Sequence, residues 1–239
     1  MKSFPSFLII LVMMAFLFTA ATAADTLPKA VLLTFDDGPD PRCTPDILDI
    51  LAEHKIKGIF FVTGKACRRH PELLQRIADE GHVLANHTFS HKVIKGMDEE
   101  QIINEITSTQ KIIYKLTNQS AKYFRPPTGA YGKREALILN ELGQEVLMWD
   151  LGLEKRNIKT AGGQVDNLIS RIGIRRELII LMHDGAPFNR HNRNTTVKAL
   201  PGLIKKLQKQ GFSFVDPSSA EGKEFIEEYI KRNPKINVY

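Results

Sequence analysis

Residues 30–39 of the chain read AVLLTFDDGP, an apolar run that ends in two aspartates and a Gly-Pro turn. The run is rich in valine and leucine and predicts a buried β-strand over Ala30–Phe35. The glycine and proline then predict a turn that holds Asp36 and Asp37 in fixed positions at the end of this strand. An acidic pair alone is a weak signal, because such pairs also follow the first strand of magnesium-dependent phosphoryl-transfer folds.

Two histidines follow another predicted strand. His87 and His91 come directly after the apolar run Val83–Ala85, and their spacing of four places both imidazoles on one face if the segment is helical. By themselves they are equally compatible with two hydrogen-bonded or surface histidines. One carboxylate of the aspartate pair and the two imidazoles form an open three-ligand set, which is typical of catalytic rather than structural zinc.

The first 24 residues predict a secretory signal peptide. Lys2 supplies a positive start, residues 7–18 are apolar, and residues 21–23 match a small-residue cleavage pattern. The apolar run is shorter than the roughly 20 residues that span a bilayer, which favours cleavage over anchoring. We therefore expect an exported protein (periplasmic, cell-envelope or secreted) whose mature part, residues 25–239, is one domain without a membrane span.

Charge is scattered over the mature part. The net charge of +6 falls by one when Lys2 is removed with the signal peptide. Small basic clusters occur at Arg68-Arg69 and Arg175-Arg176, but no basic stripe alternates with aromatic residues, so we expect no nucleic-acid partner. Cys43 and Cys67 each follow a predicted strand, and export permits a disulfide between them, with two unpaired thiols as the alternative.

Short apolar strands alternate with amphipathic helices, which predicts a parallel sheet or barrel. The expected strands are residues 30–35, 58–62, 83–85, 123–124, 145–148, 178–182 and 212–215. The expected helices open at Thr44, run over 71–80, follow Asp98 (with Gln101 in a capping box), run over 133–142, 165–172 and 195–210, and form an outer helix beyond Asp216.

In parallel α/β folds, the carboxyl ends of the strands form the binding face. Six chemically capable side chains follow predicted strands and are expected to converge there: Asp36, Asp37, His87, His91, Arg125 and His183. The other histidines lack such partners. Three of them, His54, His70 and His82, are interpreted as surface or capping residues. The fourth, His191, lies in a polar run that is typical of a solvated loop, with the wall of a substrate groove as the alternative.

Together, residues 34–39 (TFDDGP) and 87–91 (HTFSH) resemble the first two motifs of the polysaccharide deacetylases, the carbohydrate esterase family that contains the NodB homology domain. The resemblance extends from Ala30 to about Val215. It implies an α/β fold, a distorted (β/α)7-type barrel, with a divalent metal that is usually Zn²⁺. It also implies removal of acetyl groups from N-acetylated sugars.

The resemblance implies roles for individual residues. Asp37, His87 and His91 hold the metal, which lowers the pKa of bound water and polarises the acetyl carbonyl. Asp36 acts as the general base, and His183 is the acid that protonates the departing amine.

The third and fourth motifs match less well. Arg125 corresponds to an arginine that orients the base, although its Arg-Pro-Pro run also reads as a rigid turn. A backbone N–H near Thr128 is the implied oxyanion donor, at a place where the family often has tyrosine. In the fourth motif the family usually has an aspartate and then an Asp-Trp pair, which this chain replaces, and two acidic residues nearby are candidate substitutes. The replaced positions are Gly152, Lys155 and Arg156, and the candidates are Asp150 and Glu154.

We therefore expect a metal-dependent hydrolase that removes N-acetyl groups from peptidoglycan, chitin-like or poly-N-acetylglucosamine material. The expected partner is an acetylated polysaccharide or oligosaccharide, and the sequence predicts no oligomeric state. Polysaccharide O-acetyl esterase activity is one alternative, and a non-catalytic glycan-binding protein of the same fold is another. Asp36 and His183 argue against the non-catalytic alternative, because binding a metal does not require them. A phosphoryl-transfer enzyme would give the histidines and Arg125 no joint task.

Overall fold

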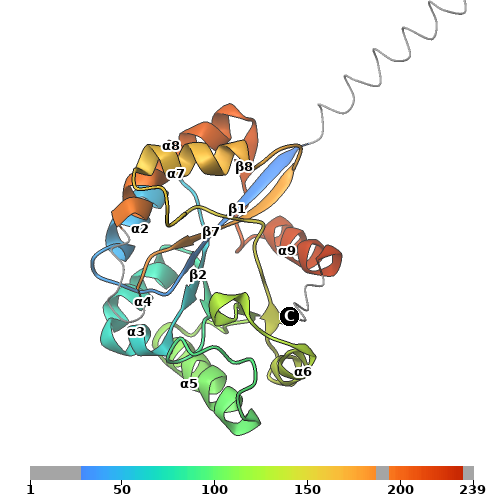
Figure 1. The fold of residues 1–239 in the computed structure, drawn as a ribbon. Helices are drawn as coiled ribbons and strands as arrows, with labels where there is room; N and C mark the ends of the chain where they lie inside the picture. Colours follow the sequence, from blue (N-terminus) through green and yellow to red (C-terminus); the bar gives the residue numbers. More distant parts are fainter. Residues whose placement is uncertain (1–27, 187–193, 234–239) are drawn as a thin grey trace, which may run out of the picture.

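The computed structural model describes residues 28–186 and 194–233, so the predicted signal peptide and His191 lie outside the described residues. Within them, a parallel sheet carries helices on both faces, which confirms the predicted α/β barrel-type fold (Figure 1). None of the helices in this part of the chain has the length and apolar character that a bilayer span requires.

Strands and helices alternate as the sequence predicts. The strands are β1 (Lys29–Asp36), β2 (Ile59–Val62), β3 (Val83–Asn86), β4 (Tyr123–Phe124), β5 (Glu145–Val146), β6 (Leu151–Gly152), β7 (Glu177–His183) and β8 (Phe212–Phe214). The helices are α2 (Thr44–Glu53), α3 (Gly64–Arg69), α4 (Pro71–Asp79), α5 (Glu99–Thr117), α6 (Lys133–Glu141), α7 (Ala161–Ser170), α8 (Asn194–Lys209) and α9 (Ala220–Arg232), with a 3₁₀ turn η1 (Pro127–Gly129). The short elements α3 and β6 are the ones that the sequence pattern does not predict.

The strand order is β5-β4-β3-β2-β1-β7-β6, and β8 pairs with the start of β1. β1 lies at the centre and is parallel to β7 along its whole length, with Asp36 opposite His183. On its other edge, Asp36 is opposite Phe61 of β2. No ladder joins β5 to β6 among the described residues, so the sheet is a curled half-barrel. The register brings the carboxyl ends of the central strands to one level.

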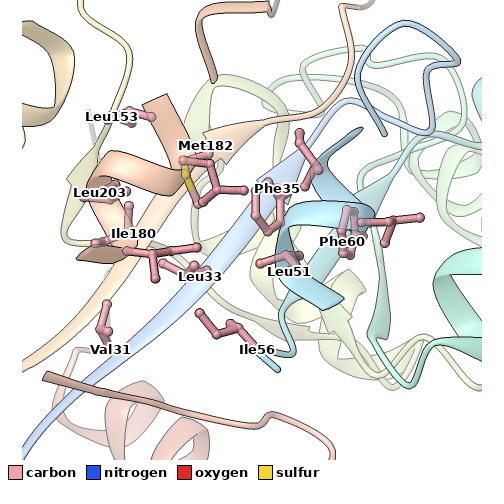
Figure 2. Packing of buried hydrophobic residues seen from close by; sticks show 14 of the residues in the cluster. Val31, Leu33, Phe35, Leu51, Ile56, Phe60, Leu153, Ile180, Met182 and Leu203 are labelled. Carbon is pink, nitrogen blue, oxygen red and sulfur yellow. The ribbon is translucent and has the colours of Figure 1, made fainter. Parts of the chain in front are cut away.

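The outer face of β1 builds the main hydrophobic core. Val31, Leu33 and Phe35 alternate along the strand and pack with residues of α2, α4, α7 and α8 (Figure 2). The rings of Phe35 and Phe60 stack with their centroids 4.8 Å apart. Burial of this many apolar side chains is the main force that holds the helices on the sheet.

The inner face of β1 changes character along the strand. Leu32 belongs to a second core cluster that α9 covers with Ile226 and Tyr229. Figure 1 shows α9 on the side of β1 opposite α7 and α8. The next inward residues, Thr34 and Asp36, are polar but fully or almost fully buried. Because buried polar groups need partners, this end of the face is a candidate site.

The structure corrects two details at helix N-termini. The Thr44-Pro45 pair predicts Thr44 as the N-cap of α2, but Cys43 is the N-cap and Thr44 is the first helical residue, with its hydroxyl used elsewhere. Asp98 is the N-cap of α5, as predicted, but it makes no side-chain cap bond, so the expected capping box with Gln101 is not formed. Asp98 and Gln101 are both exposed, and water can satisfy the backbone amides of this first turn.

The expected disulfide is also wrong. Cys43 and Cys67 are both buried thiols without an S–S bond. The residues after β2 form helix α3 rather than a loop, and this helix carries Cys67 into the main core cluster as an apolar side chain. Burial raises the pKa of the Cys67 thiol far above its usual range, which keeps it protonated and unreactive.

Candidate active site

The two aspartates at the end of β1 approach one another because Asp37 leaves the extended conformation. Consecutive side chains of a strand point to opposite faces. Asp37 has a φ of 82°, which is uncommon for a residue other than glycine and recurs at functional sites. As a result both carboxylates reach Nε2 of His87, at 3.8 Å from Asp36 Oδ2 and 3.4 Å from Asp37 Oδ1.

The turn after Asp37 is fixed by a buried carboxylate that the sequence analysis missed. Asp184 Oδ1 accepts the backbone N–H of Gly38 at 3.1 Å, and its Oδ2 accepts the Thr44 hydroxyl at 2.6 Å. A Cβ atom at Gly38 would lie 2.0 Å from Asp184 Oδ2, so only glycine fits. Burial raises the pKa of Asp184 to about 7, although the Thr44 hydrogen bond opposes the rise.

His87 and His91 lie close together although the segment between them is not helical, whereas their spacing would place them on one face only if it were a helix. The segment after β3 is irregular, and Thr88 (φ 66°) and His91 (φ 57°) both adopt the left-handed conformation. The two rings nevertheless lie with their centroids 5.0 Å apart. The expected convergence is therefore confirmed, but the local geometry that produces it differs from the expected one.

Buried polar residues hold this loop in place. Asn86 Oδ1 accepts the backbone N–H of Thr88 at 2.9 Å, and the Asn86 amide donates to the carbonyl of Ile106 in α5 at 2.9 Å. Glu105 accepts both the backbone N–H and the hydroxyl of Ser90, at 2.7 and 2.6 Å. Two hydrogen-bonded anchors, one from β3 and one from α5, thus fix the histidine loop from behind.

The donor set of Asp37, His87 and His91 fits a divalent cation. His87 Nδ1 lies 2.6 Å from the carbonyl oxygen of Arg125. Because a carbonyl can only accept, Nδ1 carries the proton and Nε2 presents a lone pair. That Nε2 atom is 3.4 Å from Asp37 Oδ1, and the Nε2 atom of His91 is 3.0 Å from the same oxygen. One ligand atom from each residue lies within 4.8 Å of the other two, and a carboxylate with two imidazoles suits zinc and related metals.

Electrostatics keeps the carboxylate of this set ionised. Burial alone would raise the pKa of Asp37, but the neighbouring His87 and His91 rings hold it well below its usual range. An ionised carboxylate is the form that binds a metal.

Arg125 connects the site to the inner face of β1. It is fully buried, and its guanidinium donates to Thr34 Oγ1 at 2.9 Å, to Asp36 Oδ1 at 2.8 Å and to the carbonyls of residues 147–148 at 2.9 and 3.0 Å. It also lies 3.9 Å over the ring of Phe61. Burial lowers the pKa of Arg125 and the Asp36 carboxylate opposes this, so the group remains a cation. Arg125 therefore fixes one oxygen of Asp36 and leaves the other beside His87.

His183, at the end of β7, has its own carboxylate partner. Glu154 Oε1 accepts the backbone N–H of His183 at 3.0 Å and the Thr196 hydroxyl at 2.6 Å, and Oε2 lies 3.1 Å from the Nδ1 atom of His183. Asp150 instead accepts the backbone N–H of Ile179, early in β7. Of the two candidate substitutes in the divergent fourth motif, Glu154 is the one that contacts His183.

The remaining predicted residues are placed as follows. Thr128 is the exposed residue of the turn η1, three positions after Arg125, with a φ of 62°. The interpretation of His82 as a surface or capping residue is wrong. This residue is only 2% exposed, just before β3, and its Nδ1 accepts the backbone N–H of Gly58 at 3.1 Å. The adjoining β2 and β3 ladder and the edge of Phe60 enclose this ring.

Features of the sequence could have identified the buried polar residues that anchor the site. Asn86 and Asp184 adjoin predicted site residues at strand ends. Glu105 lies between Ile102 and Ile106 on the buried face of α5, where a carboxylate is out of place unless it has partners.

A cleft of about 450 Å³ opens beside the three-residue set and includes Asp37 and His91 in its wall. The loop between β1 and α2 forms one side, and α3 with the start of α4 forms the other. The remaining lining residues are Pro39, Asp40, Pro41, Arg42, Thr63, Lys65, Ala66, Arg69, His70, Ser90 and Ala186. The candidate site is therefore open to a ligand larger than water.

Comparisons with known proteins agree with this geometry. Residues 23–147 match the profile of the polysaccharide deacetylase family. A peptidoglycan-N-acetylglucosamine deacetylase of Bacillus cereus is 32% identical, over 80% of this chain and 87% of the relative. A chitooligosaccharide deacetylase of a Bradyrhizobium species is 34% identical, over 77% of this chain and 87% of the relative. The solved structure of a family 4 acetyl xylan esterase from Clostridium thermocellum, in complex with a cobalt ion, is 30% identical with a TM-score of 0.68, over 78% of this chain and 87% of that one.

Proposed function

Because the chain belongs to the polysaccharide deacetylase family, we propose that it is a metal-dependent hydrolase that removes N-acetyl groups from a glycan. One observation carries this proposal. A complete Asp37/His87/His91 set lies beside a second carboxylate, Asp36, that is held by Arg125 rather than needed as a ligand. A metal site with an adjacent base is the arrangement that hydrolysis of an unactivated amide requires.

Asp37, His87 and His91 would hold the cation, and we propose Zn²⁺ because it prefers nitrogen and oxygen ligands in open three-ligand sites. When bound, such a cation lowers the pKa of water and polarises the acetyl carbonyl. The irregular loops that carry the ligands are anchored by Asp184 and Asn86. These anchors keep the ligand atoms close together before a metal arrives, which favours binding.

The proton steps are assigned to residues on either side of this set. Asp36 takes the proton from the attacking water through the oxygen that Arg125 does not hold. The amide C–N bond then breaks, and His183 gives a proton to the departing amine nitrogen while the acetyl group leaves as acetate. Glu154 accepts from Nδ1 of His183, so Nε2 is the atom that faces the leaving group, and the carboxylate offsets the positive charge of the doubly protonated ring.

Thr128 completes the proposed site. Its backbone N–H is proposed as a donor to the oxyanion that develops from the acetyl carbonyl. The left-handed φ of Thr128 turns the chain sharply between Pro127 and Gly129, as sites that present a backbone amide often require.

The substrate and the location follow from the sequence and from the names of the relatives. We propose that residues 1–24 are a signal peptide and that residues 25–239 act outside the cytoplasm as one deacetylase domain. N-Acetylated polymers of the cell envelope or of chitin type are the proposed substrates, because the relatives described above are named for peptidoglycan and chitooligosaccharides.

Acetate release from defined glycans tests the proposal. The purified mature protein should release acetate from N-acetylglucosamine oligomers, lose this activity on chelation and recover it when zinc is added back. Release from acetylated xylan alone would favour an O-acetyl esterase, the activity for which the Clostridium thermocellum protein is named. No release from either substrate with the metal site saturated would favour a non-catalytic glycan-binding protein.

A further inference from the structure

The wall of the cleft opposite the loop between β1 and α2 carries positive charge that the proposed chemistry does not use. Lys65 and Arg69 lie four positions apart on α3, so they share one face of the helix, and both line the cleft. Both side chains are exposed, and neither makes an ion pair with any residue in the ranges that the structure describes. Like charges at this spacing repel each other, so the pair costs stability unless a ligand compensates it.

The neighbouring basic residues are engaged differently. Across the cleft, the guanidinium of Arg42 donates to Asp40 Oδ1 at 2.9 Å, so the charges of these two lining residues largely cancel. Arg68, the residue before Arg69, lies 5.3 Å over the ring of Phe89. Lys65 and Arg69 are thus the cationic groups of this wall whose charge faces the cleft without a carboxylate beside it.

The cleft joins these cations to the reaction centre, because Asp37 and His91 line the same cavity. Cationic side chains on one wall of a cleft attract ligands of the opposite charge. A neutral N-acetylated sugar chain gains little from two cations, whereas an anionic substituent one or two sugars from the reacting acetamide gains a charge-assisted contact.

We propose that Lys65 and Arg69 form a subsite for an anionic substituent of the glycan, so that the enzyme prefers acidic N-acetylated glycans over neutral ones. The inference rests on the proposed deacetylase function and adds to it the charge class of the substrate. The anion is an oxyanion that a planar guanidinium and an ammonium can both bind, and a carboxylate or a phosphate on the sugar would supply it.

Steady-state kinetics on matched substrates tests the subsite. The substrates are a neutral N-acetylglucosamine tetramer, a tetramer with lactyl carboxylates on alternate sugars, the methyl ester of that tetramer, and a tetramer with a 6-phosphate. The variant is Lys65→Gln/Arg69→Gln. Its matched control is Lys111→Gln/Lys115→Gln, which removes two exposed lysines at the same spacing from α5, away from the cleft.

The wild-type enzyme should have a lower KM for an acidic tetramer than for the neutral one, and added salt should reduce the difference. The Lys65→Gln/Arg69→Gln variant should raise the KM for the acidic tetramer about five- to tenfold, as two exposed ion pairs would allow. The kcat of this variant should change less than about twofold, and so should its KM for the neutral tetramer and for the methyl ester. In the α5 control, kcat and KM should change less than about twofold on every substrate. A rise confined to the carboxylate or to the phosphate substrate identifies the source of the anion.

Several results would overturn the subsite. Equal KM values for acidic and neutral tetramers in the wild type would do so, as would equal losses on both substrates in the variant. An effect of the α5 control as large as that of the cleft variant would show that overall charge, not the subsite, matters. Turnover of the neutral tetramer separates the two proposals, because a protein that deacetylates it but ignores charge keeps the function and loses the subsite.

Discussion

On the metal side of the reaction centre both ligand loops are fixed by buried partners from other elements, whereas on the acid side one carboxylate contacts both the backbone and the ring of His183. Asp184 and Asn86 anchor the loops that carry Asp37 and His87. On the other side, Glu154 accepts from both the backbone and the ring of His183. The metal side matches the family motifs, and the acid side is where the fourth motif diverges. The carboxylate that contacts His183 can come from another sequence position because it belongs to a different segment from the metal ligands.

Replacing the proposed base should separate metal binding from turnover and have the largest effect. Asp36→Asn keeps an oxygen for the guanidinium of Arg125 but removes the group that accepts a proton. We expect kcat to fall by about 10²- to 10⁴-fold while metal content stays near that of the wild type. Acetate release and elemental analysis on the same preparation measure both quantities. Equal turnover by the variant and the wild type would remove Asp36 from the role of base.

Replacing Glu154, the carboxylate beside His183, should lower kcat less than replacing Asp36. Glu154→Gln can still accept the backbone N–H of His183 but no longer offers an anionic partner to its ring. We expect kcat to fall on the order of 10²-fold with little change in KM, because the ring loses its orientation and its counter-charge. Steady-state kinetics on an N-acetylglucosamine oligomer, with metal content as a control, measures this. Loss of metal in Glu154→Gln would show that the two sides are not independent.

His82, just before β3, should make the stability of the fold depend on pH. Burial, reinforced by Lys57, lowers the pKa of His82 from 6.5 to about 4, so the folded protein binds fewer protons than the unfolded chain between these values. Stability should therefore fall as the pH drops from 6.5 toward 4, by about 2 kcal/mol at pH 5. Urea unfolding of the wild type and of His82→Asn, which can still accept from Gly58, isolates this contribution as the difference between their pH profiles. Parallel profiles would show that His82 does not titrate in this way.

The smallest effect is expected at Asp150, the other acidic residue of the divergent motif. Asp150→Asn keeps an acceptor for the backbone N–H of Ile179 and makes no contact with His183 among those described. We expect kcat and KM to change less than about twofold, since the substitution leaves the acid side intact. A loss of kcat as large as that of Glu154→Gln would show that Asp150 also supports the function of His183.

Much of the fold could be predicted because its signals are local. The apolar run of residues 30–35 identifies a buried strand, and the rule that strand ends form the binding face gathers the site residues correctly. The geometry of the histidine loop could not be predicted, because the left-handed conformations of Thr88 and His91 depend on buried partners from other elements. The same limit applies to Cys67, whose helix α3 is too short to leave a periodic pattern.

The sequence alone also could not show whether Asp150 or Glu154 contacts His183. The two residues lie four positions apart, and both follow Met148 in a segment of little regular structure. Only the register of β6 and β7 shows that Asp150 lies beside Ile179 while Glu154 reaches the end of the strand at His183.

Metal stoichiometry tests whether Asp37, His87 and His91 together hold one cation. Apo-protein prepared by chelation would be titrated with zinc by calorimetry, for the wild type, Asp36→Asn, His87→Ala and His91→Ala, with folding checked by circular dichroism. We expect one tight site in the wild type and in Asp36→Asn, and loss of that site in both histidine variants while they remain folded. Undiminished binding of one zinc ion by the folded histidine variants would contradict it.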